Sequence, residues 1–291
     1  MRSYIKENPL LSYFVLAYAL SWIFWIAVIL LNLTENDVGL LLFLLGVYGA
    51  SGAGFIMTAI MDGRPGVRKL WARLLKWRVG FIWYLGVFIA VPAMILAGMA
   101  LYALLGNSTG PFVPGPLPML LLGAIPGIIF GPLGEEFGWR GFALPRLQER
   151  YSAFWSSVIL GILHTFWHAP LFFVGGITFG TIGENGLVTV PLFLSWVTIG
   201  TFVYTVVSNH TGASLLLAIF LHLMANSSNT ILFGMFPELS ESAPFQIMAL
   251  TQIPGWITVL VLLVVFGPAR LSRQPIPLPP EIERHTTSPA S

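Results

Sequence analysis

The run LLSYFVLAYALSWIFWIAVILLN at residues 10–32 contains no charged residue from end to end. Its length matches the ~20 apolar residues that an α-helix needs to cross the hydrocarbon core of a bilayer. The run is too long for the hydrophobic region of a signal peptide, and no small-x-small cleavage site follows it. It therefore predicts a transmembrane helix rather than a cleaved leader.

The composition extends this prediction to the whole chain. Of its 291 residues, 56% are hydrophobic and only 9% are charged, whereas about 25% are charged in an ordinary globular protein. So few charges cannot cover the surface of a soluble fold, and the alternating pattern of a β-barrel is absent. We therefore expect an all-α membrane protein. The chain has no cysteine, which excludes thiol nucleophiles, thiolate metal sites and disulfides.

Apolar runs of similar length recur along the chain and predict eight transmembrane helices. Turn-forming residues separate them, as in TEND at 34–37 and NHTG at 209–212. The segment 133–149 is expected to continue or follow the fourth helix. The eight helices are placed at residues 10–32, 38–61, 81–105, 117–132, 152–174, 187–208, 212–233 and 252–268.

The distribution of lysine and arginine predicts how the helices are oriented. With the N-terminus inside, all 14 basic residues of the chain fall on the cytoplasmic side, and every charged residue of the outer loops is acidic. The positive-inside rule therefore places both termini in the cytoplasm. The amphipathic segment WARLLKW at 71–77 is expected to lie along the anionic inner leaflet. The basic residues are Arg2, Lys6, Arg64, Arg68, Lys69, Arg73, Lys76, Arg78, Arg140, Arg146, Arg150, Arg270, Arg273 and Arg284.

Three of the few ionisable residues expected inside the membrane lie in the stretch GPLGEEFGWRGFALPRL at 131–147. Glu136 and Arg140 stand four residues apart on one helical face, with the glutamate first, which is the favourable order for an ion pair. Glu135 is rotated away from this pair. A carboxylate or an arginine at bilayer depth costs about 2.5–3.5 kcal/mol, so these side chains are expected to face the protein interior and one another.

Two further helices carry polar residues four positions apart, namely His164 with His168 and His222 with Asn226. Each pair projects from one face of its helix, so the three polar faces could converge in a bundle. Such a cluster suits attack of water on an amide or ester carbonyl, because a carboxylate can take a proton, imidazoles can hold a metal and N–H groups can stabilise an oxyanion. No GxSxG or HExxH motif occurs, which leaves serine hydrolases and HExxH metalloproteases without support.

Each of these features also has a structural interpretation. A single Glu–Arg pair in a membrane helix usually serves packing or insertion, a single histidine is usually a satisfied core residue, and an asparagine usually joins helices. Intramembrane carboxylates also fit a proton-coupled transporter, although the chain shows no obvious inverted repeat. The structural interpretations weaken when all of these residues occur together on three long helices.

The combined motifs resemble the CPBP family of intramembrane proteases, which includes CAAX prenyl endopeptidases of the Rce1 type and bacteriocin-immunity (Abi) proteins. The motifs are EExxxR at 135–140, the tryptophan–histidine pair in FWHAPLFF at 166–173 and HxxxN at 222–226. They occur in the family's order within about residues 115–235, which is the extent of the family's core domain.

The resemblance implies a role for each residue of the first motif. Glu135 would be the catalytic carboxylate that activates water, and Glu136 with Arg140 would hold this helix in place. The second motif is usually written FxxxH, whereas His164 stands where the phenylalanine is expected. We expect His164 to fill the space of that phenylalanine beside the site, and a further metal ligand is the alternative.

The other two motifs supply the remaining residues of the implied site. His168 would be a partner to the water or to a metal, and His222 with Asn226 would be a metal ligand or an oxyanion-stabilising pair. The implied cofactor is a divalent metal, with zinc expected and Glu135, His168 and His222 as its ligands. A metal-free glutamate mechanism is the alternative.

The expected function is that of an intramembrane endopeptidase of a prokaryotic cell membrane, with its site near the cytoplasmic side. Its partners would be membrane lipid and a membrane-associated peptide or protein, prenylated CAAX tails being the family's best-known substrates, and no nucleic acid is expected. A catalytically idle immunity or scaffold protein of the same fold is the alternative. The predicted regions are three helices with a basic cytoplasmic loop (62–80) in residues 1–114, the protease core at 115–235, the last helix within 236–268 and a disordered cytoplasmic tail at 269–291.

Overall fold

A computed structural model describes residues 2–174, 182–273 and 275–276 of the chain. Every regular element among these residues is a helix, which confirms the predicted all-α membrane fold. The α-helices are α1 (Arg2–Glu7), α2 (Pro9–Leu30), α3 (Asp37–Val47), α4 (Gly49–Ala72), α5 (Phe81–Leu104), α6 (Leu117–Ala124), α7 (Pro132–Glu136), α8 (Leu144–Gln148), α9 (Ala153–Trp167), α10 (Ile182–Asn185), α11 (Thr189–His210), α12 (Leu215–Gly234) and α13 (Ala243–Phe266). Short 3₁₀ segments are η1 (Arg73–Leu75), η2 (Ile125–Ile128), η4 (Ala169–Phe173) and η5 (Gly186–Val188), and η3 (Phe137–Ala143) is a π-helix.

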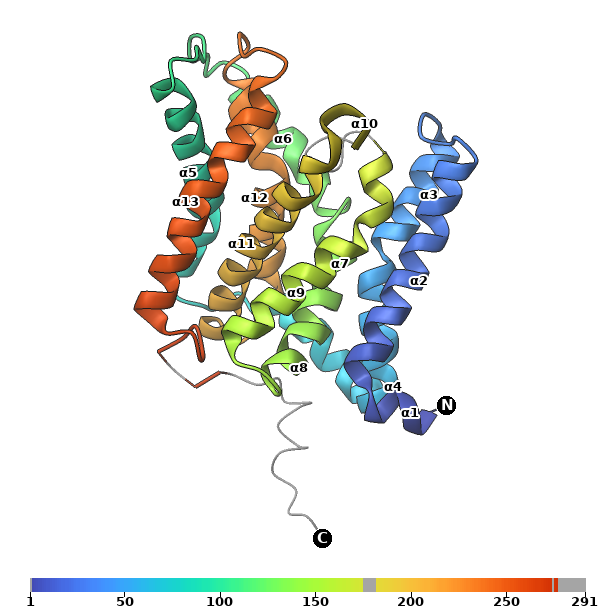
Figure 1. Cartoon of the computed structure of the whole chain (residues 1–291). Coiled ribbons are helices and arrows are strands. Elements are labelled where there is room, and N and C mark those ends of the chain that lie inside the picture. Colours follow the sequence, from blue (N-terminus) through green and yellow to red (C-terminus); the bar gives the residue numbers. More distant parts are fainter. Residues whose placement is uncertain (1, 175–181, 274, 277–291) are drawn as a thin grey trace.

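The helices form a bundle whose two ends differ in charge (Figure 1). The basic end comprises α1, the C-terminal end of α4, α8 and the C-terminal end of α13, and the basic residues of these elements and of the segment 73–78 lie there. The acidic end comprises the turns after α2, α5 and α12, with Glu35, Glu238 and Glu241. Within the bundle, α2 packs on α4, α11 packs on α9 and α13, and α5 packs on α12 and α13.

Seven helical stretches in the described part of the chain are long and apolar enough to cross a membrane. The predicted span at 152–174 is the exception, because α9 has only 15 residues. At 1.5 Å per residue it is about 22 Å long, shorter than the ~30 Å hydrocarbon core. Pro170 follows closely and cannot extend the helix, so the chain continues as the short 3₁₀ segment η4. Residues 175–181, beyond η4, lie outside the described residues.

Two helices extend beyond their predicted bounds. The second span does not end at residue 61, because α4 continues to Ala72 across a kink at Gly63, which has φ 65°. Most of the predicted basic loop 62–80 is therefore helical up to residue 75. Helix α13 begins at Ala243 rather than at residue 252. The polar residues Thr251 and Gln252 do not interrupt it, because their side chains donate hydrogen bonds to backbone carbonyls one turn earlier in the same helix.

The fourth span is interrupted rather than continuous. Helix α6 ends at Ala124, the short η2 follows, and Gly131 then precedes α7 in a non-helical conformation with φ −165° and ψ −71°. Prolines at 126 and 132 lack the N–H that a continuous helix would use. After α7 the chain widens into the π-helix η3, a feature that is frequent at functional sites.

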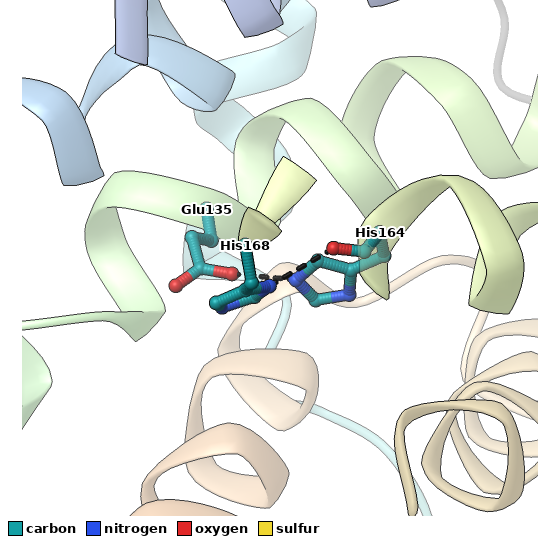
Figure 2. A group of neighbouring side chains, drawn as sticks. All are labelled: Glu135, His164 and His168. Atoms are coloured by element: carbon teal, nitrogen blue, oxygen red, sulfur yellow. Dashed lines mark hydrogen bonds and ion pairs between the residues drawn. The ribbon is translucent and has the colours of Figure 1, made fainter. Parts of the chain in front are cut away.

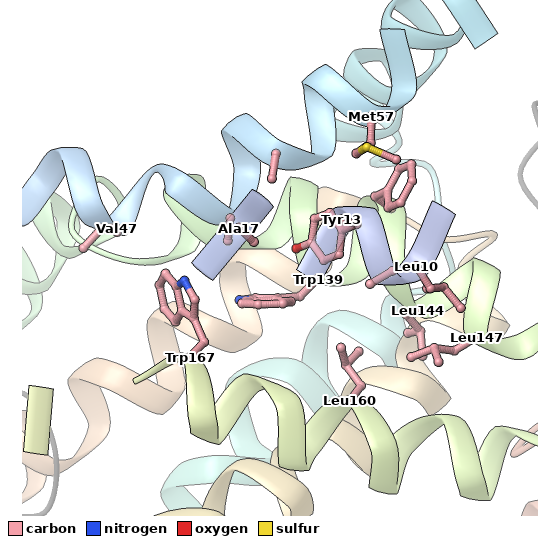
Figure 3. Close-up of a cluster of buried hydrophobic side chains, with 14 of the residues drawn as sticks. Leu10, Tyr13, Ala17, Val47, Met57, Trp139, Leu144, Leu147, Leu160 and Trp167 are labelled. Atoms are coloured by element: carbon pink, nitrogen blue, oxygen red, sulfur yellow. The ribbon is translucent and has the colours of Figure 1, made fainter. Parts of the chain in front are cut away.

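A buried aromatic and aliphatic cluster holds η3 against the first helices of the chain (Figure 3). Trp139 of η3 is fully buried and packs edge-on against Tyr13 of α2 and Trp167 of α9. Leu144 and Leu160 are also fully buried in this cluster. The packing fixes the segment that directly follows Glu135 and Glu136.

The first residues of the predicted disordered tail pack against the bundle. The backbone N–H groups of Ala153 and Phe154 donate to the carbonyls of Ala269 and Pro268 at 2.9 and 3.0 Å, and Leu271 is fully buried. Residues 277–291 of that predicted tail lie outside the described residues.

Candidate active site

The carboxylate of Glu135 lies at the meeting point of α7 and α9 and is almost completely buried. Its Oε2 accepts a hydrogen bond from Nε2 of His164 at 2.8 Å, and His168 lies on the neighbouring turn of the chain (Figure 2). The same Oε2 accepts a second bond from the indole N–H of Trp139 at 3.2 Å. Two donors therefore hold one oxygen of the carboxylate and orient the other oxygen, Oε1.

Oε1 of Glu135 faces the residues of α12. Nε2 of His222 lies 3.9 Å from it. A Cβ atom placed on Gly131 would lie 3.6 Å from Oε1, 3.4 Å from His222 Nε2 and 2.9 Å from Nδ2 of Asn226. The three polar groups thus converge beside Gly131, where the lack of a side chain leaves room for them.

The second glutamate, Glu136, is fully buried and makes two strong contacts through one oxygen. Its Oε1 accepts a bond from Arg140 at 3.0 Å and another from Nδ1 of His222 at 2.6 Å. The guanidinium of Arg140 stacks on the ring of Tyr204 at 3.7 Å from the ring centroid. Glu136 therefore joins η3 to α12 and directs the other ring nitrogen of His222 towards Glu135.

His168 is anchored by its own helix. Its Nδ1 donates to the backbone carbonyl of His164 at 2.9 Å, which leaves the lone pair of Nε2 available. Nδ1 of His164 has no hydrogen-bond partner among the described residues. Glu135, His164 and His168 each present one ligand atom, and these atoms lie within 4.8 Å of one another.

This group is the one that could hold a metal ion within the described part of the chain, and it differs from the set expected from the sequence. The bond from Nδ1 of His222 to Glu136 leaves Nε2 of His222 towards Glu135, so the predicted ligand role of His222 stays a prediction, and the structure adds His164 beside Glu135. His164 is thus more than a filler of phenylalanine's space, because it bonds the carboxylate directly. One carboxylate and two imidazoles fit a divalent metal such as zinc by donor chemistry.

Two adjoining cavities meet at these residues. The larger has a volume of about 440 Å³, and the smaller, of about 100 Å³, is lined largely by apolar residues of α5, α11 and α12. Both cavities are lined by Glu135, His168, Phe193, Trp196, His222, Ala225 and Asn226. His222 lies seven residues into α12, which is about 10 Å from the basic end at 1.5 Å per residue.

The structure adds residues that the sequence reasoning did not single out. Trp139 holds Glu135, Tyr204 covers Arg140, and Gly131 makes space for Asn226. Trp139 lies one turn after Glu135 in the same stretch, so its spacing could have indicated the contact. Nothing in the sequence singles out Tyr204, because its contact depends on how α11 packs on η3.

Comparison with known proteins agrees with the motifs. The chain is 28% identical over 248 residues to "CAAX prenyl protease 2" of Methanococcus maripaludis, covering 80% of this chain and 88% of that protein. Residues 116–228 match the family described as "Type II CAAX prenyl endopeptidase Rce1-like". These residues include all three motifs and lie within the predicted core. With its seven membrane-length helices in the described residues, the chain is an integral multi-pass membrane protein, and its residues 116–228 are similar to the Rce1-like CAAX prenyl endopeptidases.

Proposed function

We propose that this protein is an intramembrane endopeptidase in which Glu135 activates water for attack on a peptide carbonyl. The family match and the archaeal relative support the endopeptidase class. The observation that carries the mechanism is the arrangement of the Glu135 carboxylate, with two donors on Oε2 and with Oε1 directed towards His222 and Asn226 at the cavity wall.

In this mechanism Oε1 of Glu135 takes a proton from a water molecule in the cavity while the water oxygen forms a bond to the carbonyl carbon. The carbonyl oxygen becomes an oxyanion. Asn226 Nδ2 and a protonated His222 Nε2 lie on the same side of the cavity and would stabilise it by N–H donation. When the C–N bond breaks, Glu135 returns the proton to the leaving amine.

Glu136 orients His222 in this scheme. Its carboxylate accepts from Nδ1 of His222, so the Nε2 side of the ring stays towards the reacting carbonyl. The charge of Arg140 balances that of Glu136 in the protein interior. His164 and Trp139 fix the carboxylate that acts as base.

If a divalent metal such as zinc is bound, Glu135, His164 and His168 would hold it, and it would supply Lewis-acid activation of the water. The substrate that we propose is a membrane-associated peptide or protein. The apolar walls of the smaller cavity suit an apolar side chain or a lipid attached to the substrate, so prenylated CAAX-type peptides belong in the test panel.

Cleavage of a peptide panel by the full-length protein in proteoliposomes tests this proposal. Wild type should cleave at least one membrane-anchored peptide, with a single new N-terminus identified by mass spectrometry. Glu135→Ala should abolish this cleavage, whereas Glu35→Gln, at an exposed turn of the acidic end, should leave it unchanged. Equal cleavage by wild type and Glu135→Ala would refute the assignment of the base, and loss of cleavage with a chelator would establish the metal.

A further inference from the structure

The smaller cavity runs from Glu135 along α11, and one face of this helix forms much of its wall. Apart from Ile199, the lining residues of α11 recur three or four positions apart, which places them on the same side of the helix. They are Phe193, Trp196, Val197, Gly200, Val203 and Tyr204. Gly200 is the member of this face that has no side chain.

The space in front of Gly200 is open. A Cβ atom placed on Gly200 would meet Cε2 of Tyr204 at 3.8 Å, an ordinary contact, and no nearer atom of the described residues outside its own turn of helix. The contrast is Gly161 of α9, where a Cβ atom would lie 2.7 Å from Oγ1 of Thr198. Gly161 is therefore needed for helix packing, whereas the missing side chain of Gly200 enlarges the cavity.

Neither the backbone nor the packing of α11 requires a glycine at this position. Gly200 lies in the interior of a 22-residue helix and is not among the glycines with a positive φ. A glycine in the interior of a helix is less stabilising than an alanine. The feature that Gly200 provides here is therefore the volume beside the catalytic residues.

The walls around this volume are suited to an apolar group. Met94 of α5 and Leu221 of α12 contribute to them. Arg140 also lines the cavity, but its guanidinium stacks on the ring of Tyr204 at 3.7 Å and pairs with Glu136 at 3.0 Å. Its charge is thus already neutralised by a neighbouring carboxylate, and the remaining wall favours an aliphatic occupant.

The size and position of the cavity restrict this occupant further. Its volume is about 100 Å³, whereas an apolar cavity of about 150 Å³ is needed to hold benzene. A branched aliphatic side chain fits this volume better than an aromatic ring or a long lipid chain does. Glu135, His168 and His222 line both cavities, so the occupant would lie directly beside the reacting carbonyl.

We propose that Gly200 is a specificity-determining residue of this protein. The cavity in front of it receives the aliphatic side chain of a residue that flanks the scissile bond, and the missing side chain of Gly200 sets the largest size that is accepted. A lipid attached to the substrate would lie outside this cavity. The proposal rests on the proposed peptidase function for the nature of the ligand, and on the open space at Gly200 for the selectivity.

The test uses the full-length protein in proteoliposomes and a peptide that wild type cleaves. The residue on each side of its scissile bond would be changed in turn to alanine, valine, leucine or phenylalanine. Wild type should prefer leucine or valine to phenylalanine on one side. In Gly200→Ala the ratio of kcat/KM for the leucine peptide to that for the alanine peptide should fall about 10–200-fold, the effect of one methylene in an apolar pocket.

The matched control is Gly86→Ala. Gly86 is an exposed glycine of α5, it lines neither cavity, and a Cβ atom there would meet nothing within 4 Å among the described residues. This variant should keep the wild-type ratio. The unfolding temperature of Gly200→Ala should equal or exceed that of wild type, because alanine favours the helix and its Cβ fits the open space.

An unchanged ratio in Gly200→Ala would overturn the proposal, and so would a wild-type preference for phenylalanine on both sides. A lower unfolding temperature would also overturn it, because Gly200 would then serve packing. If wild type cleaves no peptide, the proposed function fails, and the affinities of the leucine and alanine peptides still test the selectivity. A preference for leucine that Gly200→Ala loses would support the assignment, and equal affinities in wild type would refute it.

Discussion

At the scale of single residues, adjacent glutamates have different surroundings and therefore different proposed roles. Glu135 has one oxygen held by His164 and Trp139 and the other directed towards the cavity residues of α12. Glu136 is fully enclosed and shares one oxygen between Arg140 and His222. The first arrangement suits a base, and the second suits a fixed support.

Trp139→Phe should lower kcat by roughly 10–100-fold, because a hydrogen bond to a charged group contributes about 1.5–3 kcal/mol and the carboxylate would lose one of its two anchors. KM should change little, since the indole does not line either cavity. Trp256→Phe is the control, because it loses an indole bond to the hydroxyl of Ser195 and neither residue lines a cavity. Equal losses of kcat in both variants would show that the effect is only one of packing.

Glu136→Gln should lower the thermal unfolding temperature strongly, because removing one partner of a buried pair costs about 3–5 kcal/mol. Replacing both partners, in Glu136→Gln with Arg140→Met, should recover much of this stability, since no charge is then left unpaired. Peptide cleavage should remain low in the double variant, because His222 still lacks its carboxylate. Recovery of cleavage together with stability would show that His222 does not depend on Glu136.

At the scale of helices, the break in the fourth span brings the site together. Gly131 lies between η2 and α7, and its missing side chain leaves the space that Asn226, His222 and Glu135 occupy. Helix α7 then places Glu136 beside α12, and the π-helix η3 places Arg140 beside α11.

Gly131→Ala should therefore lower kcat/KM on the order of 10–100-fold, because the new Cβ would lie 2.9 Å from Nδ2 of Asn226 and displace it. Gly127→Ala is the control, since its Cβ would meet Leu223 at 3.5 Å, an ordinary contact. The unfolding temperature of both variants should stay close to that of wild type. If Gly131→Ala keeps full activity, Asn226 does not need its present position.

The sequence predicted the apolar helices and the clustering of the polar motifs because both depend on local spacing. It did not predict the break at 125–131, since a glycine- and proline-rich apolar stretch can continue as a helix or interrupt it. It also did not predict that His222 bonds Glu136 and that His164 bonds Glu135. Those contacts depend on the rotation of α9 and α12 about their axes, which only the packed bundle fixes.

At the scale of the whole molecule, the buried guanidinium of Arg73 ties the segment after α4 to η3 and to the turn before α12. Arg73→Met should be among the most destabilising changes at the basic end, by about 3 kcal/mol or more, because three buried carbonyls lose a charged donor. Arg78→Met should have little effect, since Arg78 is exposed and contacts the ring of Trp77. Thermal unfolding of both variants in one detergent measures the difference, and equal unfolding temperatures would contradict the role given to Arg73.

The central claim is that Glu135 is the base of an intramembrane peptidase. The most direct measurement is the single-turnover rate of peptide cleavage in proteoliposomes by Glu135→Gln and by wild type. The comparison requires that the two proteins have the same unfolding temperature. Because general-base catalysis contributes about 10²–10⁴-fold, the rate should fall by at least 10²-fold while peptide binding is retained. A variant that binds the peptide and cleaves it within about threefold of the wild-type rate would contradict the mechanism, since a glutamine side chain cannot take the proton of water.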